Sequence, residues 1–82
     1  MRVLYCHPLE PKKTRDAIAF VDVELSGDLR LLGLMLLRQP DGNYFIYAPQ
    51  AGECRTASFS RYLAEELTAL AVQAYEAASN ER

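Results

Sequence analysis

The 82-residue sequence has no excess of positive charge, because its nine lysines and arginines are outnumbered by eleven aspartates and glutamates. Binding to nucleic acids without sequence preference draws most of its strength from many cations placed on phosphates. With a net charge of −2, the chain could make such contacts only through a local basic patch. Half of its residues are apolar, which is typical of globular proteins, and its length predicts a single domain over residues 1–82.

Cysteine, histidine and glycine are scarce and scattered. The only histidine is His7, and its neighbour Cys6 would point to the opposite face of a strand, so the two cannot form a catalytic pair. Cys6, His7 and Cys54 also lack the close spacing of zinc ligands, and the glycines form no phosphate-binding loop. We therefore expect no enzyme activity, no metal and no cofactor. A Cys54–His7 pair across the fold is the arrangement that the sequence leaves open.

Long apolar runs and targeting signals are missing from the sequence as well. No apolar run approaches the ~20 residues of a membrane span, and no charged-then-apolar leader opens the chain. These features predict a cytoplasmic protein with reduced thiols. A disulfide between Cys6 and Cys54 is the less favoured alternative.

The order of apolar segments and turn signals predicts a small α+β fold. Turns are expected at Ser26–Asp28 and Pro40–Asn43, where glycine and proline accompany polar residues. After Ser58 or Ser60 the apolar residues follow helical spacing, as in Leu63 and Leu67. We expect a small twisted antiparallel sheet of about four to five strands and one C-terminal helix. The extended segments are expected at 3–6, 15–25, 30–38, 44–48 and 54–59.

The uncharged run Leu31–Leu37, between Arg30 and Arg38, is the most informative segment. Its leucines and methionine also favour a helix, but Gly33 and the short length between two turns favour a strand. A strand with one face in water alternates apolar and polar residues, whereas this run does not alternate. Both of its faces must therefore be covered. Because one helix covers one face only, the run predicts a homodimer formed through strand contacts.

Alternate residues of this run form two stripes. One stripe holds Leu32, Leu34 and Leu36, and the other holds Leu31, Gly33, Met35 and Leu37. The sequence leaves open which stripe packs on the helix. We assign the dimer interface to Leu32, Leu34 and Leu36.

Three segments together resemble the stage V sporulation protein G (SpoVG) family of septation regulators. Arg15–Leu25 is similar to that family's strand R-A-I-A-S-I-T-L, and Phe45–Gln50 is similar to its signature F-V-A-M-P-S. Gly52–Arg55, followed by Ala74–Glu76, resembles its G-E-F-R and its closing A-x-x-E-Y. The resemblance covers about residues 2–78. It implies a dimeric, bacterial, non-enzymatic regulator that binds DNA and RNA.

The chain departs from that family where the family carries basic residues. After Pro49-Gln50 it reads Ala51-Gly52, in place of an insertion that contains lysine or arginine. If this departure removes nucleic-acid binding, the chain is instead a protein–protein interaction module with the same fold. The basic side chains expected to contact phosphates are Lys12, Lys13, Arg15, Arg55 and Arg61.

Overall fold

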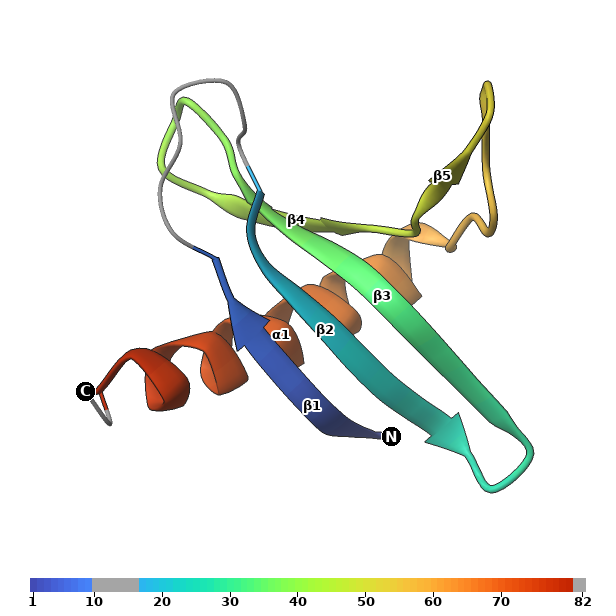
Figure 1. Ribbon diagram of the computed structural model, residues 1–82, viewed down its shortest axis with the longest axis horizontal. Helices are drawn as coiled ribbons and strands as arrows, with labels where there is room; N and C mark the ends of the chain where they lie inside the picture. Colours follow the sequence, from blue (N-terminus) through green and yellow to red (C-terminus); the bar gives the residue numbers. More distant parts are fainter. Residues whose placement is uncertain (10–16, 81–82) are drawn as a thin grey trace.

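The computed structural model describes residues 1–9 and 17–80 of the chain. It contains a four-stranded antiparallel sheet, a separate two-stranded hairpin and one helix (Figure 1). This architecture confirms the predicted α+β fold, with a small antiparallel sheet and one C-terminal helix. The elements are β1 (Arg2–Pro8), β2 (Ala17–Ser26), β3 (Leu29–Arg38), β4 (Tyr44–Tyr47), β5 (Gln50–Ala51), β6 (Cys54–Arg55) and α1 (Arg61–Asn80).

The four strands of the large sheet lie in the order β1-β2-β3-β4, so each strand pairs with its neighbour in the sequence. β2 and β3 are joined by the predicted tight turn, and Ser26 pairs with Leu29 across it. The hydroxyl of Ser26 accepts a hydrogen bond from the backbone N–H of Asp28 at 3.2 Å, which fixes this turn. The run 31–37 lies within β3, so its interpretation as a strand is confirmed.

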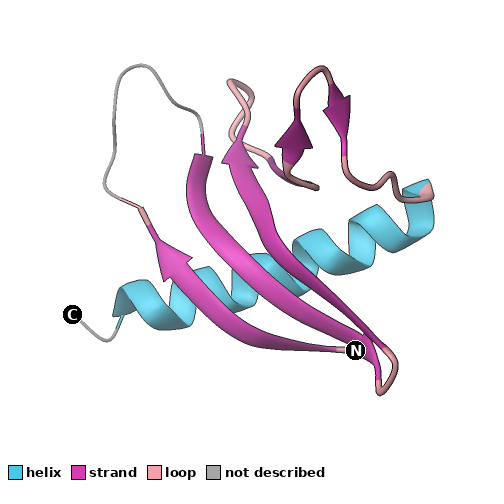
Figure 2. Cartoon of the chain, turned by 45° about the vertical axis from the view of Figure 1, so that its right-hand side comes forward, coloured by secondary structure: helices cyan, strands magenta, loops and turns pink. Residues whose placement is uncertain are grey.

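The core lies between α1 and one face of the sheet, and Figure 2 shows the helix lying across that face. On β2, the side chains of Ala19, Val21 and Val23 point toward the helix, and all three are fully buried. Leu67 and Ala71 of α1 close the core from the other side. The alternating pattern of β2 and the helical spacing of α1 both predict these residues as buried.

The helix begins directly after Ser60. Its hydroxyl accepts a hydrogen bond from the backbone N–H of Leu63 at 3.2 Å, which is the bond expected of a helix N-cap. Of the two predicted starts, Ser60 is therefore confirmed and Ser58 is not. The residues before it also differ from expectation: only Cys54–Arg55 of the segment 54–59 is a strand, and it pairs with Gln50–Ala51. This hairpin projects from the body of the protein (Figure 1).

Gly33 interrupts the alternation of β3. Its φ of 72° lies in the left-handed region, and its backbone N–H donates to Oδ1 of Asp22 on β2 at 2.8 Å. The pairing of β2 with β3 shifts by one residue at this point, between the Val21–Leu34 and Val23–Leu31 pairs. Such a shift, with a glycine in the left-handed conformation, is a β-bulge.

The structure shows that the predicted dimer interface of Leu32, Leu34 and Leu36 is wrong. Leu34 and Leu36 are 1% and 0% exposed within a single chain, because the helix covers their face of the sheet. Leu31, on the other side of the bulge, also packs against this core, whereas Leu32 is 63% exposed. Leu34 and Leu36 are therefore not available to a second copy, and the predicted stripe does not exist as one surface.

Candidate interaction site

The face of the sheet that points away from α1 carries a row of apolar side chains. In Figure 1 the sheet lies in front of the helix, so this face is turned toward the reader. Its residues alternate along the strands with buried residues such as Val21, Leu36 and Ile46. Among residues 1–9 and 17–80, the helix packs on the other face, and Arg55 of β6 reaches the outer one at the ring of Tyr47. We call this surface the outer face, and its apolar members are Phe20, Met35, Leu37, Phe45 and Tyr47.

The apolar members of the outer face are neighbours across three strands. Phe20 of β2 pairs with Met35 of β3, and Met35 pairs with Tyr47 of β4. Leu37 pairs with Phe45, whose ring centroid lies 4.8 Å from that of Tyr47. Because directly opposed side chains on one face of a sheet contact each other, these residues form one continuous apolar patch. Phe20 is 37% exposed even with these neighbours.

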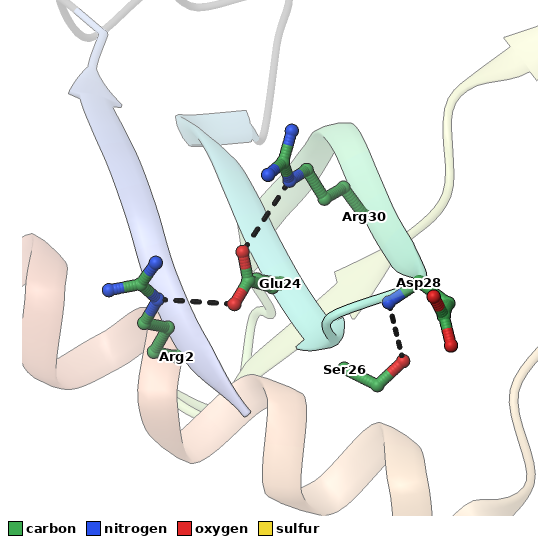
Figure 3. A network of polar contacts seen from close by, with 5 residues as sticks. All are labelled: Arg2, Glu24, Ser26, Asp28 and Arg30. Atoms are coloured by element: carbon green, nitrogen blue, oxygen red, sulfur yellow. Dashed lines mark hydrogen bonds and ion pairs between the residues drawn. The ribbon is translucent and has the colours of Figure 1, made fainter.

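The opposite end of the outer face, near the β2–β3 turn, is polar. Glu24 alternates with the buried Val23, and the Nε atoms of Arg2 and Arg30 each lie 3.4 Å from one of its carboxylate oxygens (Figure 3). The hydrogen bond from Arg2, opposed by desolvation and supported by Arg30, holds the pKa of Glu24 below its ordinary value. The outer face is therefore divided into an apolar patch and a charged end.

The residues predicted to bind phosphates do not form one group in the described part of the chain. Lys12, Lys13 and Arg15 lie outside the described residues. Arg55 donates from Nη1 to the carbonyl oxygen of Ala48 at 2.9 Å, and its guanidinium lies over the ring of Tyr47, 4.8 Å from the centroid. Arg61 forms an ion pair with Glu65 at 3.2 Å on the solvent side of the helix.

The charge balance of the described residues is acidic. Across residues 1–9 and 17–80 there are eight carboxylates and five arginines, and each of these arginines has a partner within the chain. Arg38, the remaining one, donates to the hydroxyl of Tyr44 at 2.7 Å and lies over its ring. Because phosphate binding draws its strength from many cations, this acidic balance does not favour a phosphate-binding surface on the described body.

The two thiols form no disulfide with each other. Cys6 and Cys54 are both free, so the alternative of a disulfide is wrong. Burial raises the pKa of the Cys6 thiol, and Cys54 is exposed on β6. His7 lies beside Tyr5, whose hydroxyl is 3.4 Å from Nδ1. Over the described ranges, no three histidine, cysteine or acidic side chains gather into a metal-binding group, and no helix there has the length and apolarity to cross a membrane.

Comparison with known proteins finds no match for this chain among family models, curated proteins or solved structures. The resemblance to the septation regulators thus stays a prediction that rests on three short segments. The sequence analysis did not identify the outer face as a surface. The signal was present, because Phe45 and Tyr47 alternate with Ile46.

Proposed function

We propose that the chain is a non-catalytic protein-interaction module, and that its outer face binds a second copy of the same chain. The observation that carries this proposal is the uncovered apolar patch on β2, β3 and β4. Removing apolar surface from water is favourable by about 25 cal/mol per Å². A second sheet laid on this patch would supply the cover that the single helix cannot provide.

The chemistry of the patch favours a copy of itself as the occupant. In a two-fold symmetric dimer each residue near the axis meets the same surface on its partner, so a charge there would meet a like charge. The members of the apolar patch are uncharged, Arg55 reaches the patch only at the ring of Tyr47, and Arg2, Glu24 and Arg30 lie together at the far end of the sheet (Figure 3). The centre of the patch, at Phe20 and Met35, therefore carries no charge that would oppose a second copy.

Met35→Glu tests the proposal, because Met35 lies in the middle of the patch and pairs with both Phe20 and Tyr47. We expect the wild type to have twice the mass of one chain at micromolar concentration in sedimentation equilibrium. Burying an unpaired carboxylate costs several kcal/mol, so Met35→Glu should weaken the dimer by at least ~100-fold and leave a folded monomer. Ala69→Glu is the matched control, since Ala69 is exposed on α1.

Two results would contradict the dimer. One is a wild type that stays monomeric at about 100 μM, a concentration at which an interface of standard size is normally occupied. The other is a Met35→Glu variant that dimerises as tightly as Ala69→Glu. Circular dichroism of both variants shows whether each is folded, so a loss of mass is not confused with unfolding.

The second candidate function is the binding of DNA or RNA by such a dimer. We also propose the cytoplasmic location that the sequence predicts. It is favoured by the resemblance to the septation regulators and by the guanidinium of Arg55 over the ring of Tyr47, since cations and aromatic rings together bind single strands. Lys12, Lys13 and Arg15 would add contacts to phosphates. A salt titration against DNA and RNA pools tests it: we expect affinity to fall with a log–log slope of several units. If neither DNA nor RNA binds at low salt, nucleic-acid binding is rejected and the self-association module is the remaining function.

A further inference from the structure

A small cleft lies beside the edge strand β4, where the segment after β6 passes the beginning of α1. Its volume is about 210 Å³ and its walls are mainly apolar. It is separate from the charged end of the outer face, although Phe45 and Tyr47 contribute to both surfaces. The lining residues that matter for its chemistry are Phe45, Tyr47, Arg55, Ala57, Ser58 and Phe59.

Hydrogen bonds between three segments hold the walls of the cleft in place. The backbone N–H of Ile46 donates to Oγ1 of Thr68 at 3.2 Å, and that hydroxyl donates to the carbonyl of Ala64 at 2.7 Å. These bonds join β4 to α1. The backbone N–H and the hydroxyl of Thr56 both donate to the carbonyl oxygen of Pro49, at 2.9 and 3.0 Å. The segment after β6 is thereby fixed to the end of β4.

Arg55 gives the cleft its charge. It is the only charged side chain among the lining residues, and all of these lie in the described part of the chain. Its contact with the ring of Tyr47 and its bond to Ala48 hold the guanidinium at the cleft. The bond to Ala48 uses one donor of a group that has five. The remaining donors can bind a carboxylate in the two-pronged geometry that guanidinium groups favour.

We propose that this cleft binds a small aromatic monocarboxylate, with its ring between the aromatic walls and its carboxylate on Arg55. The volume is below the about 300–1,000 Å³ of sites for drug-sized ligands, so it suits a single ring with a short acid side chain and is too small for a nucleotide. The positive charge and the apolar lining select an anion with an apolar body. This proposal does not rest on the proposed dimerisation: the cleft shares Phe45 and Tyr47 with the outer face, but its charged contact is Arg55, which the dimer proposal does not use.

The probe is 3-phenylpropionate, and its amide, 3-phenylpropionamide, is the uncharged control. Both are titrated into the ¹⁵N-labelled full chain while backbone amide shifts are recorded. We expect saturable shifts at Ala48, Arg55 and Ala57, and at least tenfold tighter binding of the acid than of the amide. Arg55→Gln should remove this preference and bring the two affinities together. Arg61→Gln is the matched control, because Arg61 pairs with Glu65 and does not line the cleft.

A second variant keeps the proposal testable if Arg55→Gln does not fold. Ser58 is exposed at the cleft, so Ser58→Leu should place methyl groups in it and weaken both probes by at least tenfold. The proposal is overturned if the acid and the amide bind the wild type equally, if neither saturates by about 10 mM, or if the shifts fall outside the cleft. A peptide that ends in a free phenylalanine carboxylate and binds more tightly than the acid would also overturn the assignment to a small molecule.

Discussion

Replacing Gly33 with alanine should destabilise the protein through the backbone alone. The added Cβ would meet only Cγ of Pro49 at 3.7 Å, which is an ordinary van der Waals distance. The penalty comes instead from the φ of 72°, because a left-handed conformation costs a residue with a Cβ about 1–2 kcal/mol. A domain of this length is stabilised by about 4–12 kcal/mol in total. The substitution should thus remove a substantial part of the free energy of unfolding.

Thermal unfolding followed by circular dichroism measures this effect. A loss of about 1–2 kcal/mol lowers the Tm of a domain of this size by roughly 5–15 °C. Gly27→Ala is the matched control, since Gly27 lacks a positive φ and an added Cβ there has nothing within 4 Å. Gly27→Ala should leave the Tm unchanged or raise it slightly, because alanine restricts the unfolded chain. Equal Tm values for the two variants would refute the bulge at Gly33.

Two further predictions test the buried stripe of β3 and the charged end of the outer face. Leu36→Ala should lower the free energy of unfolding by about 2–5 kcal/mol in urea denaturation, whereas Leu32→Ala should change it by less than about 0.5 kcal/mol under monomeric conditions. A comparable loss in both would contradict the exposure of Leu32. For Glu24, the folded-state pKa lies below the ordinary value of 4.5, so its stabilising effect is present above that pH and is lost as the pH falls through the lowered pKa. The Tm of wild type should therefore exceed that of Glu24→Gln near pH 7 and approach it near about pH 3. A constant difference over this range would contradict the role assigned to Arg2.

The elements of the sheet could be predicted because their signals are local. The alternation of Val21, Asp22 and Val23 specifies which face of β2 is buried, and a glycine-containing turn specifies the antiparallel return. Helical spacing around Leu67 specifies α1 in the same way. Each of these patterns reflects a period of the backbone, so a single sequence is sufficient to find it.

The bulge and the cleft could not be predicted for a common reason. The left-handed φ of Gly33 is useful only because Asp22, eleven residues earlier, accepts its N–H across the sheet. The contact of Arg55 with Tyr47 similarly depends on a hairpin whose strands have two residues each, too few to show any period. Since one inserted residue turns the following side chains to the opposite face, the bulge separates Leu32 from Leu34 and Leu36, whereas the burial of Leu34 and Leu36 depends on which stripe faces the helix, a choice that the sequence leaves open.

The two proposed surfaces share aromatic residues, yet each can be tested without the other. Met35→Glu changes the centre of the outer face and leaves Arg55 and Ser58 in place, whereas Ser58→Leu fills the cleft and leaves the apolar patch unchanged. If Tyr47 couples the two sites, dimerisation changes the affinity for the ligand by some factor. Thermodynamic linkage then requires the ligand to change the dimerisation constant by the same factor. Comparing 3-phenylpropionate binding by wild type and by Met35→Glu therefore yields the coupling between the sites. Two separate sites require that Met35→Glu loses dimerisation but still binds 3-phenylpropionate, and that Ser58→Leu loses ligand binding but still dimerises.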